Sequence, residues 1–166
     1  MGQQTKQPLN SMPMSEKKQP ARTRILLADD SPAVLAGIRR LLHPEFEIVG
    51  SVSDGLALVA AAKILRPDVL IVDIMMPGLS GLEAVRQLRK LRKFSAIAIM
   101  LTVFDDPSMV AEARAAGAMG YVVKSAADRD LVNAIHASLE GRFYSSPTRN
   151  RTERHTLRPA KSLSRR

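Results

Sequence analysis

The sequence contains no cysteine, and it has few long apolar runs. Without cysteine the chain cannot form a disulfide, a thiolate zinc site or a cysteine nucleophile. Its longest strongly apolar run, residues 94–104, contains Ser95 and Thr102 and is much shorter than a membrane span. The first 20 residues also lack the apolar core of a secretion signal. We therefore expect a cytoplasmic protein without membrane contact.

Positive charge is concentrated at the two ends of the chain. The net charge is +9, of which residues 1–24 contribute +4, residues 147–166 contribute +6 and residues 25–146 contribute −1. Both ends have few large apolar side chains, too few to offset the entropy cost of ordering them. We predict one folded domain at residues 24–145, between a disordered tail at 1–23 and a disordered basic tail at 146–166.

Between the ends, short apolar segments alternate with segments of helical spacing. The predicted strands are residues 25–28, 47–52, 69–72, 96–101 and 120–123. Ser31, Asp54 and Ser80 stand where helix N-caps are expected, and Glu83 completes a capping box with Ser80. This alternation is typical of an α/β fold with a parallel sheet covered on both faces. We predict a doubly wound (βα)5, flavodoxin-like three-layer sandwich with strand order 2-1-3-4-5.

Polar side chains follow four of the five predicted strands. Asp29 and Asp30 follow the first, Asp73 the third, Thr102 ends the fourth and Lys124 follows the fifth. The carboxyl ends of parallel strands meet at one edge of a sheet, so these side chains are expected to lie in one crevice. Three carboxylates so close repel one another and need a cation, and Mg²⁺ suits such oxygen ligands.

This set of residues fits the chemistry of phosphoryl transfer. A carboxylate can attack phosphorus and form an aspartyl-phosphate. The metal and Lys124 would neutralise the new charge, while the Thr102 hydroxyl would donate a hydrogen bond to a phosphoryl oxygen. Each residue alone has an ordinary structural explanation, and the functional interpretation depends on their combination.

Four motifs, in order, resemble the receiver domains of two-component response regulators: "LLADDSP", "LIVDIMMPGLSG", "IMLT" and "GYVVKSA". The resemblance covers residues 24–145. The closing stretch "AIHASLEGRFYSSP" is most similar to the NarL/FixJ subfamily, whose members usually continue into a helix-turn-helix DNA-binding domain. Here the sequence ends where that domain would begin.

The resemblance implies a role for each candidate residue. It makes Asp73 the acceptor of a phosphoryl group from a sensor histidine kinase or phosphotransfer protein. It assigns Mg²⁺ to Asp29, Asp30, Asp73 and the backbone carbonyl of Met75, and the switch and phosphate contacts to Thr102, Tyr121 and Lys124. It also implies a signalling protein with weak autophosphatase activity rather than an enzyme in the usual sense.

The implied mechanism is a population shift in which Thr102 moves toward the phosphoryl group and Tyr121 turns inward. The sequence departs from many receivers after the lysine, where Ser125 replaces a proline. A cis peptide bond without proline costs about 3–4 kcal/mol. We therefore predict that the Lys124–Ser125 bond is trans or, if cis, stores strain.

Two hypotheses remain open for the output. In the first, the chain is a single-domain interaction module or phosphate shuttle, with homodimer formation on phosphorylation as one mode of action. In the second, it is a truncated or tail-mediated DNA-binding regulator that contacts nucleic acid only through its basic tail. That tail supplies seven cations: Arg149, Arg151, Arg154, Arg158, Lys161, Arg165 and Arg166.

Overall fold

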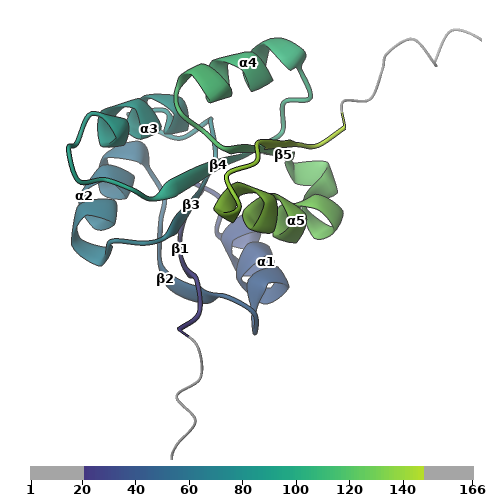
Figure 1. Cartoon of the computed structure of the whole chain (residues 1–166), viewed down its shortest axis with the longest axis horizontal. Helices are drawn as coiled ribbons and strands as arrows, with labels where there is room; N and C mark the ends of the chain where they lie inside the picture. Colours follow the sequence, from purple (N-terminus) through teal and green to yellow (C-terminus); the bar gives the residue numbers. More distant parts are fainter. Residues whose placement is uncertain (1–20, 148–166) are drawn as a thin grey trace, which may run out of the picture.

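The structure, a computed structural model, describes residues 21–147. The tails predicted at residues 1–23 and 146–166 fall almost wholly outside this range and stay predictions. Within it, strands and helices alternate along the chain (Figure 1). In order they are β1 (Arg24–Ala28), α1 (Pro32–Leu42), β2 (Glu47–Val52), α2 (Gly55–Leu65), β3 (Val69–Val72), α3 (Gly81–Arg89), β4 (Ile97–Thr102), α4 (Pro107–Ala115), β5 (Gly120–Val123), η1 (Lys124–Ala126), α5 (Ala127–Leu139) and β6 (Tyr144–Ser145).

The strands form one parallel sheet in the order β2-β1-β3-β4-β5-β6. The predicted order 2-1-3-4-5 is confirmed, and β6 adds an edge strand beyond β5 that the sequence analysis did not predict. A two-residue strand has no periodicity to detect, which explains the omission. The hydrogen-bonded chain continues one residue past the strand, because the Ser146 amide donates to the Tyr121 carbonyl at 2.9 Å.

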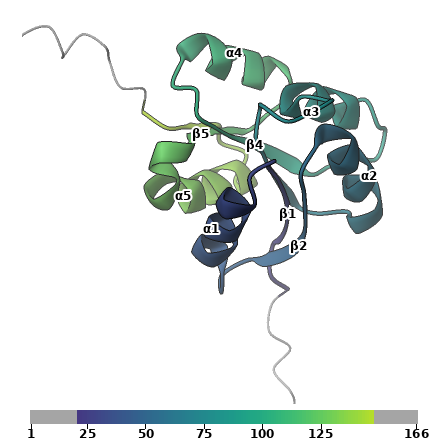
Figure 2. The same cartoon turned by 180° about the vertical axis from the view of Figure 1, so that it is seen from behind.

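Helices cover both faces of the sheet, as expected for a parallel sheet (Figures 1 and 2). On β1, Ile25 and Leu27 face α1 and α5, whereas Leu26 and Ala28 face α2, α3 and α4. Most strand residues are therefore buried on either face, and the central strand β3 is wholly buried. Polar groups gather where these strands end, since their interior positions are filled by apolar side chains.

The predicted helix starts are confirmed. Ser31 Oγ accepts from the Val34 amide, Asp54 Oδ1 from the Ala57 amide and Ser80 Oγ from the Glu83 amide. These caps satisfy free amides in the first turn of α1, α2 and α3, and so fix where each helix begins after its strand. Among the helices of residues 21–147, none is long and apolar enough to cross a membrane.

Candidate functional site

The site lies where β1 and β3 end side by side. Ala28 and Val72 are paired in the sheet, and the next residues continue the pairing: the Asp73 amide donates to the Ala28 carbonyl at 2.8 Å. The Asp29 amide is held in the same way by the Val52 carbonyl of β2, at 3.1 Å. Both carboxylates are buried, with 3% of Asp29 and 5% of Asp73 exposed. The strand register thus places two buried acids next to each other.

One cation, Lys124, lies between these two carboxylates. Its Nζ donates to Asp73 Oδ2 at 2.7 Å and lies 2.7 Å from Asp29 Oδ2, where it forms an ion pair. Burial alone would lower the pKa of Lys124, but the contacts with Asp29 and Asp73 outweigh it and raise that pKa above its ordinary value. The ammonium is therefore held in its charged form between the two carboxylates.

The other oxygens of both acids organise the loops that follow. Asp29 Oδ1 accepts from the Ser31 amide at 2.9 Å, and Asp73 Oδ1 accepts from the Met75 amide at 3.2 Å. Asp29 Oδ2 is different, because it is buried and, apart from its ion pair, no aligned hydrogen bond reaches it within the described chain. Because a buried carboxylate oxygen is costly without partners, Asp29 Oδ2 is suited to bind a cation.

The three predicted carboxylates can share a metal ion. One oxygen each of Asp29, Asp30 and Asp73 lies within 4.8 Å of the others, and Asp30 is the exposed member. Hard oxygen donors on two strand ends, with one side open to solvent, fit Mg²⁺ and the water it retains. The Met75 side chain is 60% exposed. The ligand role predicted for its backbone carbonyl stays a prediction.

Thr102 and Tyr121 are connected through the backbone of Phe104, in the loop between β4 and α4. Thr102 is fully buried, and its Oγ1 accepts from the Phe104 amide at 3.4 Å. The Tyr121 hydroxyl donates to the Phe104 carbonyl at 2.8 Å. Both predicted switch residues therefore form a hydrogen bond with the backbone of the same residue, Phe104.

Tyr121 is turned inward, with only 1% of the residue exposed. Burial, followed by the charges of Asp106 and Asp105, raises the pKa of its phenol to about 12. The side chain belongs to the core under α2, α3 and α4. This inward position is the one that the sequence analysis associates with the activated state, and it is also that of a packing aromatic.

The Lys124–Ser125 peptide bond is trans, as predicted. Within residues 21–147 the cis peptide bonds are limited to His43–Pro44. A trans bond after the lysine is compatible with its position, since Nζ still reaches both carboxylates.

Gly81 is a site residue whose role the sequence analysis missed. A Cβ atom added at Gly81 would lie 1.9 Å from the Asp73 carbonyl oxygen, so α3 can begin this close to β3 only with glycine. The predicted cap at Ser80 already makes Gly81 the first residue of α3, as observed, but the sequence does not show how close this residue lies to the end of β3.

Comparisons with known proteins agree with this geometry. Residues 25–136 match the family described as the response regulator receiver domain. The chain is 38% identical over 122 residues to the response regulator UvrY of Escherichia coli K12. The aligned region covers 72% of this chain and 56% of UvrY. It is 34% identical over 119 residues to the nitrate/nitrite response regulator protein NarL of the same organism. The aligned region covers 70% of this chain and 55% of NarL.

A solved structure shows the same fold. The crystal structure of a LuxR-family two-component response regulator from Aurantimonas sp. SI85-9A1 superposes with a TM-score of 0.72 at 35% identity, covering 76% of this chain and 91% of that one. The chain spans about half the length of the curated relatives it matches. On the strength of the family match and these relatives, the chain belongs to the response regulator receiver domains, among relatives of the NarL type.

Proposed function

We propose that this protein is a phosphorylation-dependent switch in a two-component phosphorelay, with Asp73 as its phosphoacceptor. Receiver domains of response regulators are signalling proteins, which gives the general class. Lys124 Nζ lies 2.7 Å from both Asp73 and Asp29, so the observation that carries the assignment to Asp73 is the strand order: β3, which leads into Asp73, lies between β1, which leads into Asp29, and β4, which ends in Thr102. Asp30 belongs to the same cluster of carboxylates but is exposed, whereas Asp73 is buried.

The residues divide the chemistry among them. A carboxylate oxygen of Asp73 attacks the phosphorus of a phosphohistidine on a sensor histidine kinase or phosphotransfer protein. The new P–O bond forms as the P–N bond breaks, and the electron pair of the P–N bond returns to the imidazole. Lys124 stays beside the added phosphoryl group and balances its charge. Mg²⁺ held by Asp29, Asp30, Asp73 and the Met75 carbonyl would supply further charge neutralisation. Slow hydrolysis of the acyl phosphate is the weak autophosphatase activity we expect.

The output is proposed to arise from the Phe104 connection. A phosphoryl oxygen at Asp73 offers the Thr102 hydroxyl a stronger acceptor than water, so the hydroxyl turns toward it. That movement alters the Thr102 contact with the Phe104 amide, and the Tyr121 hydroxyl bonded to the same residue stabilises the resulting loop position. Phosphorylation thereby shifts the population of the β4–α4 loop and of the surface around it.

The test is phosphorylation of the full chain by acetyl phosphate, followed by intact-mass measurement. We expect one added phosphoryl group on the wild type with Mg²⁺, and none after Mg²⁺ is removed with a chelator. Asp73→Asn should take up none, whereas Asp128→Asn, an exposed acid on α5, should behave as wild type. Modification of Asp73→Asn to the wild-type extent would refute the assignment.

A second output is favoured by two observations: a basic C-terminal segment, and relatives of which the match covers little more than half, among them the transcriptional regulatory protein YdfI of Bacillus subtilis, covered to 58%. In this alternative the seven cations after residue 147 contact phosphates of nucleic acid. Binding would then weaken steeply with salt and be lost on deletion of residues 148–166. Binding that persists after the deletion would assign the contact to the folded domain.

Homodimer formation is the partner interaction that we propose for the phosphorylated form, through α1 with α5 or through α4 with β5. Sedimentation of wild type with and without beryllofluoride and Mg²⁺ distinguishes it from a monomeric module. A change in molar mass that also occurs in Asp73→Asn would exclude phosphorylation as its cause.

A further inference from the structure

A second concave site lies at the opposite edge of the sheet from Asp73. It is a cavity of about 500 Å³ between the end of α2 and the connection from α3 to β4. Asp68, which lines it, immediately precedes β3, and Asp73 immediately follows the same strand. Its size is within the range of small-molecule sites in proteins. The cavity is therefore separate from the phosphorylation site by the length of β3.

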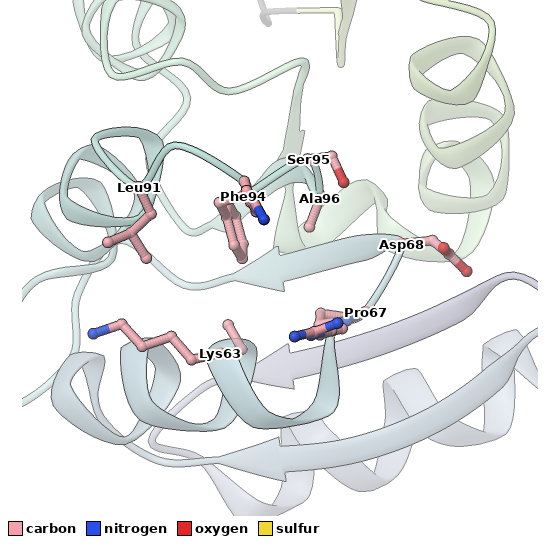
Figure 3. A pocket seen from close by; sticks show the side chains of 10 residues that line it. Lys63, Pro67, Asp68, Leu91, Phe94, Ser95 and Ala96 are labelled. Carbon is pink, nitrogen blue, oxygen red and sulfur yellow. The ribbon is translucent and has the colours of Figure 1, made fainter.

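One part of the cavity is apolar. Figure 3 shows Leu91 and Phe94, on the connection after α3, opposite Lys63 and Pro67 on the side of α2. The ring of Phe94 points into the space between these segments. Phe94 is half-buried and Leu91 is 37% exposed, so both retain apolar surface that a ligand can cover. A ligand that packed against Leu91 and Phe94 would remove this apolar surface from water, which favours binding.

The other part is positively charged. Lys63, Arg66 and Lys93 line the cavity, and within residues 21–147 none of their side chains forms an ion pair. The one acidic lining residue, Asp68, accepts a hydrogen bond from the Arg24 amide at 2.7 Å. The described domain is otherwise close to neutral, so three unpaired cations around one cavity are a local excess that favours an anion.

We infer that this cavity binds an organic phosphate, with the phosphates on Lys63, Arg66 and Lys93 and a flat apolar group on Phe94. An aromatic face beside lysine and arginine side chains is the combination that holds a nucleotide base and its phosphates. Inorganic phosphates satisfy only the cations, and an apolar molecule satisfies only the ring. A nucleotide uses both halves of the cavity, which decides the chemical class.

This inference does not depend on the proposed function. The cavity contains none of the residues around Asp73, and binding there needs neither phosphorylation nor Mg²⁺. A ligand that packs between α2 and the α3–β4 connection would contact the residues at which β3 and β4 begin, because Asp68 and Ala96 directly precede these strands. The site is therefore placed to influence the response regulator without touching its phosphoacceptor.

The experiment is calorimetric titration of the full chain, at low salt and without Mg²⁺, with ATP and separately with inorganic tripolyphosphate. We expect saturable binding of both, with ATP the tighter ligand. Lys63→Gln and Lys93→Gln should each weaken both ligands about three- to fivefold, the range of an exposed charge contact. Phe94→Leu keeps an apolar side chain but removes the aromatic face, and should weaken ATP about fivefold while leaving tripolyphosphate unchanged.

The matched control is Lys90→Gln, which removes an exposed charge from the end of α3 but does not line the cavity. The basic tails carry the same charge in every variant, so binding to them is a constant background in the comparison between variants. If Lys90→Gln weakens binding as much as Lys63→Gln and Lys93→Gln do, or neither ligand saturates, the site is refuted. Equal effects of Phe94→Leu on both ligands, or loss of ATP binding in Asp73→Asn, would also overturn it.

Discussion

At the scale of single residues, the site combines a charge constraint with a steric one. Asp29 and Asp73 are buried 2.7 Å from one ammonium, so a single positive charge is shared between two of the three carboxylates and the cluster keeps a negative charge. The position of Asp73 in turn depends on Gly81, whose missing side chain lets α3 approach the carbonyl of that residue. Gly81 thereby keeps Asp73, the proposed phosphoacceptor, within reach of Lys124.

Gly81→Ala tests the steric constraint. The added Cβ would meet the Asp73 carbonyl oxygen at 1.9 Å, so α3 or the end of β3 must shift, and the free energy of unfolding should fall by at least about 2 kcal/mol. Phosphorylation by acetyl phosphate should slow as well. Gly37→Ala is the control: its Cβ meets nothing within 4 Å and it lies inside α1, so it should stabilise by about 0.5–1 kcal/mol. Equal effects in urea unfolding would contradict this account.

Tyr121→Phe tests the hydroxyl contact with Phe104. Its loss should lower the free energy of unfolding by about 1 kcal/mol near pH 7. The folded pKa of Tyr121 is raised to about 12, against about 10 for the unfolded chain, so its contribution is present below pH 10 and is lost as the pH rises through 12. Wild type should therefore lose more stability than Tyr121→Phe over that interval.

Absorbance titration near 295 nm gives an independent check on the same residue. The difference between wild type and Tyr121→Phe isolates one phenol, although the pKa of the other tyrosine, Tyr144, is also raised by burial. A difference titration centred near pH 10 would show that Tyr121 is exposed to water and would contradict its inward position.

At the scale of elements, β6 is attached to the sheet by a buried polar network. Ser146 Oγ donates to Asp130 Oδ2 on α5 at 2.7 Å and accepts from the Val123 amide of β5 at 3.3 Å. Asp130 is also paired with Arg129 at 2.8 Å. The last described residues are thus bound to the strand that carries Tyr121 and leads into Lys124.

Ser146→Ala should cost about 1–3 kcal/mol, because the Val123 amide and the Asp130 carboxylate both lose a buried partner. Ser145→Ala, whose hydroxyl bonds only the neighbouring Ser146 carbonyl, should cost less.

The contact with Arg129, and then that with Ser146, lowers the pKa of Asp130. Its stabilisation is therefore present above the unfolded pKa of about 4 and is lost as the pH falls. The difference between Ser146→Ala and wild type should shrink below pH 4, and a constant difference in urea unfolding would be evidence against the network.

At the scale of the molecule, the features that repeat or sit at strand ends were predictable from the sequence. Apolar runs and helix caps predicted the strands and helices, and the rules for connecting parallel strands predicted their order in the sheet. The rule that the carboxyl ends of parallel strands share an edge predicted that Asp29, Asp73 and Lys124 lie close together. Contacts between single residues distant in sequence were not predictable. Ser146 with Asp130 and Gly81 with the Asp73 carbonyl leave no pattern in the chain, because each depends on the final packing of helices on the sheet.

The arrangement proposed for the whole domain places the phosphoacceptor Asp73 at one edge of the sheet and the output in β4, Phe104 and β5. The most direct test records amide NMR spectra of wild type with and without beryllofluoride and Mg²⁺, which mimic the phosphoryl group. We expect shifts that extend from Asp73 through Thr102 and Phe104 to Tyr121, absent in Asp73→Asn and reduced beyond Thr102 in Thr102→Ala. Shifts confined to the residues around Asp73, or unchanged in Asp73→Asn, would contradict the account.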